Sequence, residues 1–132
     1  MSKKFFVYGT LKVGGRFAPS LDHLRKSVKT ASLSGFDLFG VAAMKGWPPD
    51  YPAAVKGGGE IKGEVHEFTD DVEALGILDS IEGYDDRDPE GSLYIRSEVE
   101  VTLGTGGKET AFVYLFNRDI QDHYPRMEEW KI

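Results

Sequence analysis

The 132-residue sequence contains no cysteine. This absence excludes disulfide bonds, thiolate zinc sites, iron–sulfur ligation and a cysteine nucleophile. It also fits a reducing compartment, so we expect a cytoplasmic protein. Histidine is scarce as well, since His23, His66 and His123 are the three present, and no two of them have the i, i+4 spacing of one helix face. A metal site built from all three histidines stays open on this evidence, although we favour a structural role for His66.

Positively charged residues are also few, and long apolar runs are missing. Lys and Arg number 16 against 22 Asp and Glu, which gives a formal net charge of −6. A basic surface for nucleic acid is therefore missing, and an acidic chain is repelled by anionic lipid. No stretch approaches the roughly 18 apolar residues that span a membrane, and the apolar run before Gly9 is too short for a signal peptide. We expect neither nucleic acid nor a membrane as a partner, and the sequence leaves the oligomeric state open.

What the chain does contain is typical of one globular domain with many turns. Apolar residues make up 40% and charged residues 29%, a balance that argues against disorder. The 16 glycines and 6 prolines favour turns and strands over long helices. We expect a single domain over residues 1–132, with a core of about 3–117 and a C-terminal tail over 118–132.

Strand signals cover most of the chain. We predict strands over residues 4–8, 53–56, 61–68, 93–103 and 110–116, and two more, bent at Gly35 and Gly40, within 27–43. The turn 104–107 joins the strands on either side of it as a hairpin, and the glycines 57–59 close the strand before them. The segment 4–8 hardly alternates, so both of its faces should be buried. The segment 110–116 is apolar on both faces, which predicts a central position.

The strongest helix signal lies over residues 70–81. Asp70 and Glu73 have capping-box spacing, and Gly83 stands where a left-handed residue ends a helix. We expect one apolar stripe that recurs every three residues, formed by Val72, Leu75, Leu78 and Ile81.

Two shorter helices are also predicted. One covers residues 19–25, with Ser20 as its cap. The other is amphipathic and lies in the tail, with Pro125 in its first turn. So few helices among six or seven strands indicate a mostly-β fold of the α+β class, namely a small barrel or a strongly bent sheet with one or two helices against it.

A glycine and a hydroxyl residue directly follow the first buried strand, within Tyr8-Gly9-Thr10-Leu11. Such a strand end exposes backbone N–H groups, which can hold a carboxylate or an oxyanion. An ordinary tight turn explains the same residues, so local physics leaves both interpretations open.

Glu82 falls on the last turn of the predicted helix. A carboxylate there faces the negative end of the helix dipole. With Ile81 and Tyr84 as an apolar wall, partial desolvation would raise the pKa of Glu82 toward neutrality, which suits a general base. A solvent-exposed glutamate without a chemical role is the alternative.

Together these features resemble the γ-glutamylcyclotransferase-like (AIG2-like) proteins. The resemblance rests on ordered segments over residues 5–116: Phe6-Val7-Tyr8-Gly9-Thr10-Leu11-Lys12, Tyr51-Pro52-Ala53-Ala54-Val55, Gly63-Glu64-Val65, Asp79-Ser80-Ile81-Glu82-Gly83-Tyr84, Leu93-Tyr94-Ile95-Arg96 and Ala111-Phe112-Val113-Tyr114. Each segment alone is weak, but their order along most of the chain is specific. The resemblance implies a small mixed β-barrel with one or two flanking helices.

The resemblance also implies a reaction, the release of 5-oxoproline and a free amine or amino acid from a γ-glutamyl compound. Glu82 would take a proton from the α-ammonium group and return it to the leaving nitrogen, after the freed amine attacks its own γ-carbonyl carbon. The backbone amides of Tyr8, Gly9, Thr10 and Leu11 would hold the α-carboxylate. Neither a metal nor a cofactor is implied.

Three further residues have two possible roles each. Tyr94 and Tyr114 have counterparts in the family and are candidates for substrate binding, although each also fits a core tyrosine whose hydroxyl caps a network. Arg96 fits either a carboxylate ligand or a structural ion pair, and we favour the ion pair.

The segment 85–92 is acidic and lacks the ligand order of a calcium loop. If it borders the pocket, we expect it to favour leaving groups that carry positive charge. Two alternatives to a cyclotransferase stay open, an enzyme of the same fold with a different amide or acyl substrate and a non-catalytic ligand-binding module.

Overall fold

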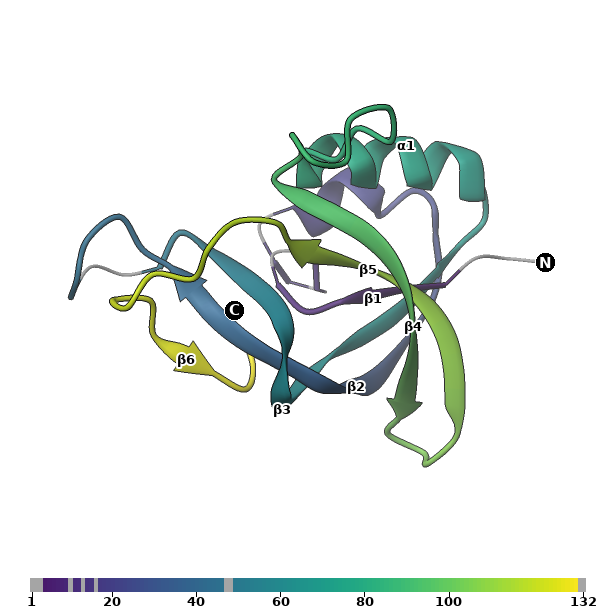
Figure 1. Cartoon of the computed structure of the whole chain (residues 1–132). Coiled ribbons are helices and arrows are strands. Elements are labelled where there is room, and N and C mark those ends of the chain that lie inside the picture. The colour runs from purple at the N-terminus through teal and green to yellow at the C-terminus, as the bar shows by residue number, and fades with distance from the viewer. Residues whose placement is uncertain (1–3, 10, 13, 16, 47–48, 131–132) are drawn as a thin grey trace.

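Five strands close into a barrel, which the computed structural model describes over residues 4–9, 11–12, 14–15, 17–46 and 49–130 (Figure 1). The strands are β1 (Lys4–Val7), β2 (Arg25–Val41), β3 (Tyr51–Phe68), β4 (Tyr94–Leu103) and β5 (Lys108–Phe116). Their order is β3-β1-β5-β4-β2, and the pairing of β2 with β3 closes the ring. β1 lies parallel to β5, and the other pairs are antiparallel. The expected mixed, mostly-β barrel is confirmed.

The side chains of β1 alternate between two apolar clusters. Phe5 packs in the cluster shared with Leu78 on the helix, while Phe6 packs inside the barrel with Val113 of β5. Both phenylalanines are 1% exposed, so β1 is buried on both faces as predicted. β5 lies between β1 and β4, which confirms its central position.

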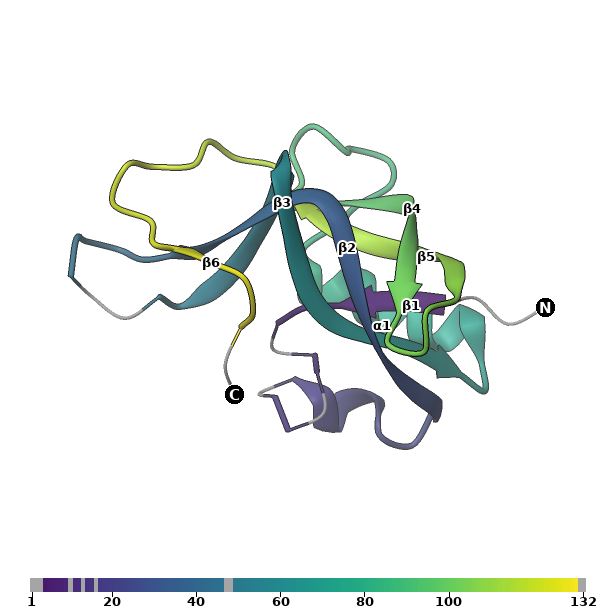
Figure 2. The ribbon, with the colours of Figure 1, turned by 90° about the horizontal axis from the view of Figure 1, so that it is seen from below.

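β2 and β3 are longer than the sequence predicted and pair along nearly their whole length. Figure 2 shows that their far ends project from the barrel as an arm. The prediction of two strands within 27–43 is wrong, because a bulge at Gly35, whose φ is +87°, bends β2 without ending it. The prediction that glycines 57–59 close a strand is also wrong. A Cβ on Gly57 would lie 2.0 Å from the Asp37 carboxylate, so this glycine makes room for Asp37 within the paired arm.

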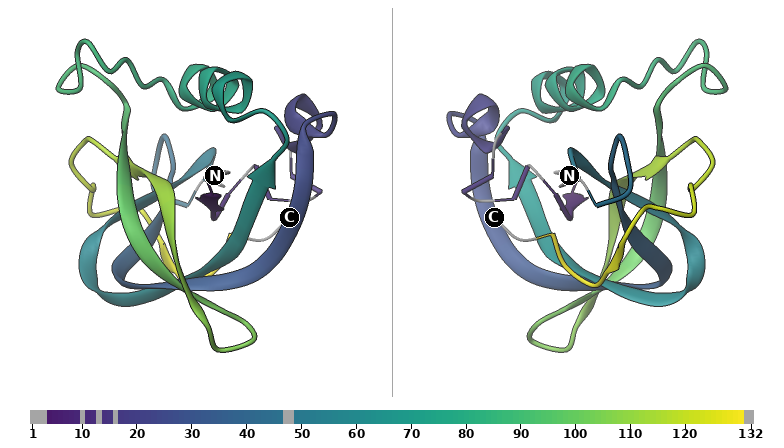
Figure 3. Two further views of the ribbon diagram at one scale, coloured as in Figure 1. Left: turned by 90° about the vertical axis from the view of Figure 1, so that its right-hand side faces the viewer. Right: turned by 90° about the vertical axis from the view of Figure 1, so that its left-hand side faces the viewer.

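The main helix forms as predicted and lies against the barrel, where Figure 3 shows it end-on. Helix α1 spans Asp71–Glu82, the N-cap Asp70 accepts a hydrogen bond from the Glu73 N–H at 3.0 Å, and Gly83 ends the helix with φ +66°. These three residues match the capping signals in the sequence.

The predicted apolar stripe of α1 is wrong at Val72, which is 83% exposed. The buried face carries Ala74 and Leu78 instead. At 100° per residue, a three-residue repeat slips by 60° at each step, so Val72 and Ile81 lie on opposite sides of the helix.

The two short predicted helices also differ in the structure. The first is a 3₁₀ turn, η1 (Ala18–Leu21), preceded by Phe17, so Ser20 lies inside it and is not its cap. The tail forms no helix within the residues that the structure describes. Its residues Arg126–Met127 form strand β6, which pairs with β2 on the arm (Figure 2). Without β6, this edge of β2 would present backbone N–H and C=O groups without partners. A helix in the tail would leave them unpaired, whereas a strand pairs with them.

The close approach of β1 and β3 gives a stability prediction. A Cβ on Gly63 would lie 2.6 Å from the Val7 carbonyl oxygen and 2.7 Å from the Phe6 ring, and a closed barrel cannot spread to admit it. Gly63→Ala should lower the free energy of unfolding by about 1–3 kcal/mol in urea denaturation. Gly58→Ala on the same strand is the control, because a Cβ there meets nothing within 4 Å. Equal losses in the two variants would contradict this packing.

Candidate active site

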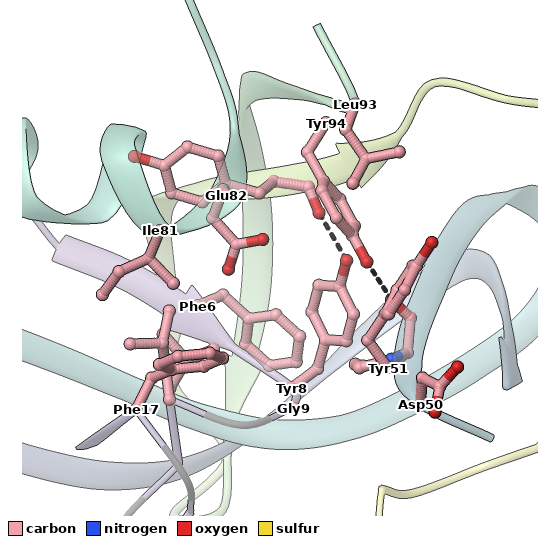
Figure 4. A pocket seen from close by; sticks show the side chains of 14 residues that line it. Phe6, Tyr8, Gly9, Phe17, Asp50, Tyr51, Ile81, Glu82, Leu93 and Tyr94 are labelled. Atoms are coloured by element: carbon pink, nitrogen blue, oxygen red, sulfur yellow. Dashed lines mark hydrogen bonds between the residues drawn. The ribbon is translucent and has the colours of Figure 1, made fainter. Parts of the chain in front are cut away.

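A cavity of about 320 Å³ opens where the end of β1, the start of β3, the end of α1 and the start of β4 meet (Figure 4). This volume suits a small-molecule ligand. The cavity brings together nearly all the predicted site residues, namely Tyr8, Gly9, Leu11, Glu82, Tyr94 and Tyr114. Thr10, the remaining one, falls outside the described residues. Segments separated by more than 100 positions in the sequence thus meet at one hollow.

Glu82 is the last residue of α1, and its carboxylate points into the cavity (Figure 4). Burial raises the pKa of Glu82 from 4.5 to about 7. Ile81 and Leu93 form part of the apolar wall around it. The expectation that Tyr84 belongs to this wall is wrong, because its ring lies 5.1 Å from the Arg96 guanidinium carbon and does not line the cavity.

The turn that bears Glu82 is tied to the barrel through Asp79. The Arg96 guanidinium on β4 donates to both oxygens of the Asp79 carboxylate, at 2.6 and 2.7 Å. The Tyr114 hydroxyl on β5 donates to the same carboxylate at 2.5 Å. Arg96 therefore has the structural ion pair that the sequence analysis favoured. These bonds hold the last turn of α1 at a fixed place over the cavity.

The floor of the cavity depends on contacts between Gly9, Pro52 and Tyr94. A Cβ on Gly9 would lie 2.3 Å from the Pro52 ring, so no other residue fits there without a shift. The Tyr94 hydroxyl donates to the Pro52 carbonyl. Sequence reasoning quoted Tyr51 and Pro52 as part of a resemblance but did not place them in the site, where both line the cavity.

The hydroxyls of Tyr8 and Tyr94 stay protonated at neutral pH. Burial, and beyond it the charge of Glu82, raises the pKa of both. Tyr8 donates its proton to the Tyr114 carbonyl at 2.5 Å, as Tyr94 does to Pro52. Since a hydroxyl has one proton and two lone pairs, each oxygen can offer a ligand only an acceptor. The two oxygens and the Glu82 carboxylate border the same cavity (Figure 4).

The acidic segment 85–92 contributes no residue to the lining of the cavity. It is held by its own contacts instead, since Asp85 pairs with Arg87 and the Ser92 hydroxyl donates to the Asp88 carbonyl at 2.9 Å. The premise of a charge-selecting loop is therefore wrong. Asp50, which no sequence pattern singled out, is a second acidic residue beside Glu82 in the lining of the cavity.

The histidines do not form a metal site. His66 is 1% exposed, contacts Glu64 at 2.9 Å through Nε2 and accepts a hydrogen bond from Arg25 at Nδ1, so its role is structural as predicted. Across the described parts of the chain, no three potential ligand side chains gather closely enough to hold a metal. Nor does any helix there have the length and apolar character that crossing a membrane requires.

Comparison with known proteins agrees with this geometry. The family model for γ-glutamyl cyclotransferase, AIG2-like proteins matches residues 5–132. None of the curated proteins compared with the chain matches it.

Several solved structures share the fold. An AIG2-like protein from Mus musculus is 21% identical, with a TM-score of 0.67 over 98% of this chain and 88% of its own. An uncharacterized protein from Pyrococcus horikoshii is 24% identical, with a TM-score of 0.62 over 96% and 86%. A structure described as a gamma-glutamyl cyclotransferase is 21% identical, with a TM-score of 0.59 over 96% and 70%.

The burial of Glu82 gives a prediction about stability and pH. Between pH 4.5 and about 7 the folded protein binds more protons at this carboxyl than the unfolded chain does. The free energy of unfolding should therefore fall across that window as pH rises. Glutamine is neutral throughout, so Glu82→Gln should gain stability relative to the wild type, by up to about 3 kcal/mol at pH 8, at about 1.4 kcal/mol per pKa unit.

Urea denaturation at pH 4.5, 6 and 8 measures this difference. Glu73→Gln is the control, because that side chain is exposed at the other end of the same helix. A stability difference between Glu82→Gln and the wild type that stays constant with pH would show that the carboxyl is not desolvated.

Proposed function

Because the chain belongs to the γ-glutamyl cyclotransferase, AIG2-like family, we propose that it converts a γ-glutamyl compound into 5-oxoproline and a free amine or amino acid, with Glu82 as general acid and base. One observation carries the proposal. A carboxyl whose pKa burial raises to about 7 points into a cavity of small-molecule size, beside the loop that follows β1. An ordinary surface glutamate has neither property.

The proposed reaction is an intramolecular transfer. Ionised Glu82 accepts a proton from the substrate's α-ammonium group, and the freed amine attacks the γ-carbonyl carbon to close a five-membered ring. Glu82 then gives this proton to the leaving nitrogen as the original amide C–N bond breaks. The second proton of the ring nitrogen follows through the same carboxylate, so the amine leaves as an ammonium ion. The atoms balance without water or a redox equivalent. Since both reacting groups belong to one molecule, holding the substrate folded removes much of the entropic barrier.

The raised pKa of Glu82 matches this proton transfer. An α-ammonium group has a pKa of about 8, and burial raises the pKa of Glu82 to about 7. The transfer is then uphill by about one pKa unit, or about 1.4 kcal/mol. A glutamate at its ordinary value would face a gap of more than three units, so burial makes Glu82 a better base.

The lining of the cavity suits the two charged groups on the α-carbon of a γ-glutamyl compound. We assign the α-carboxylate to the backbone N–H groups of the loop at Tyr8, Gly9, Thr10 and Leu11. The hydroxyl oxygens of Tyr8 and Tyr94 present acceptors, which suit the ammonium donor. Tyr114 would act through its bond to Asp79, which holds the turn of Glu82.

The test is a panel of γ-glutamyl-α-amino acids, γ-glutamyl-ε-lysine and γ-glutamyl-alkylamines, with 5-oxoproline detected by mass spectrometry. We expect at least one compound to be turned over, and Glu82→Gln to reduce kcat/KM by about 100-fold or more. Glu73→Gln should match the wild type. Product at an undiminished rate from Glu82→Gln would refute the role of Glu82, and no product from any compound would favour another amide substrate or a binding module.

The pH dependence of turnover is a second test of the same role. The base must be ionised and the substrate's α-amino group protonated, so kcat/KM should fall about tenfold per pH unit below pH 7 and decline again above about pH 8. Steady-state kinetics between pH 5 and 8.5 with the best compound of the panel measures this profile. A flat profile down to pH 5 would mean that the essential base has an ordinary carboxyl pKa.

A further inference from the structure

Lys12 is a buried lysine next to the cavity. It is 6% exposed, although a lysine is seldom buried without partners. Its ammonium group donates to the Trp130 carbonyl at 2.9 Å and lies 3.6 Å from a Glu129 carboxylate oxygen. These partners replace part of the hydration that the ammonium loses. They come from the far end of the chain, 118 positions away.

The C-terminal segment, residues 125–130, is fixed by the arm and not by Lys12 alone. The Pro125 carbonyl accepts from the Gly40 N–H and the Glu128 carbonyl accepts from the Lys62 N–H, each at 2.9 Å. Strand β6 adds pairing with β2 between these two bonds. The place of the Trp130 carbonyl is therefore set by β2 and β3, which makes it an anchor independent of the cavity.

Lys12 connects this anchor to the cavity lining. Its backbone N–H donates to the Gly9 carbonyl at 3.0 Å, which closes the turn after β1. Gly9 and Leu11, within that turn, line the cavity. A shift of the Lys12 side chain would therefore move the backbone that we assign to the substrate's α-carboxylate.

We propose that the C-terminal segment is a strap that positions the loop at Tyr8, Gly9 and Leu11, and that Lys12 is the positioning residue through which it acts. The inference rests on the proposed function in one respect, which is the assignment of the substrate's α-carboxylate to this loop. The contact between strap and loop stands on the geometry alone. An unstrapped loop would bind substrate less well, while Glu82 would keep its place at the end of α1.

Hydrogen–deuterium exchange tests the strap without any need for activity. Lys12→Met removes the ammonium and keeps the apolar stem, and Glu129→Ala removes the side-chain partner of Lys12 on the strap. Both full-length variants should show faster exchange of the amides in residues 8–12, and the double variant should show no further increase. Lys56→Met, at an exposed lysine on β3, is the control. If Glu129→Ala leaves exchange in residues 8–12 unchanged, the inference is wrong, even if Lys12→Met fails to fold.

Kinetics with the best γ-glutamyl compound tests the consequence for the site. Lys12→Met and Glu129→Ala should each raise KM by roughly tenfold and change kcat by less than about threefold, as expected for lost binding that is common to ground and transition states. Wild-type turnover with KM unchanged in both variants would overturn the positioning role. No turnover by the wild type would overturn the proposed function instead, and the exchange measurement would still decide whether the strap exists.

Discussion

The desolvation of one carboxyl, that of Glu82, is the constraint on which the rest of the site depends. Burial disfavours the charged form of Glu82 and raises its pKa to about 7. If the turn moved outward, water would solvate the carboxylate and its pKa would return toward the ordinary value. The Asp79 ion pair with Arg96 and the Tyr114 hydroxyl prevent that movement. Desolvation of Glu82 is thus tolerated because a neighbouring carboxylate on the same turn is well paired.

Close packing within the barrel holds the part of the site that lies opposite Glu82, namely the loop after β1 and the start of β3. Gly9 lies against the Pro52 ring, and Tyr94 holds the Pro52 carbonyl, so the loop after β1 and the start of β3 are fitted to each other. Each contact joins segments that are distant in the sequence. A barrel closed by β2 and β3 keeps these segments in register, which is why a site built from several strand ends retains one shape.

Local signals in the sequence predicted local structure well. Asp70 and Gly83 mark the ends of α1 as they stand in the structure, and the turn 104–107 joins β4 and β5. Asp70 and Gly83 together predict that Glu82 lies on the last helical turn, where the structure has it. The resemblance then named most of the cavity lining, because its segments fall on the strand ends that meet there.

What the sequence did not reveal depends on contacts between distant residues. A glycine can end a strand or make room within one, and only the Asp37 side chain shows that Gly57 does the latter. The tail reads as an amphipathic helix in isolation, but the edge of the arm offers it backbone partners and β6 forms instead. Likewise, no local pattern links Lys12 to Trp130.

The measurement that tests this account most directly is the ionisation of Glu82 itself. Carbon-13 NMR of the side-chain carboxyl across pH 3–9, with Glu82→Gln to assign the resonance, gives the midpoint of its titration without a substrate. The account predicts a midpoint near pH 7, well separated from the exposed glutamates. A midpoint near 4.5 would contradict it, because Glu82 would then be an ordinary solvated carboxylate and the argument for a general base in this cavity would be lost.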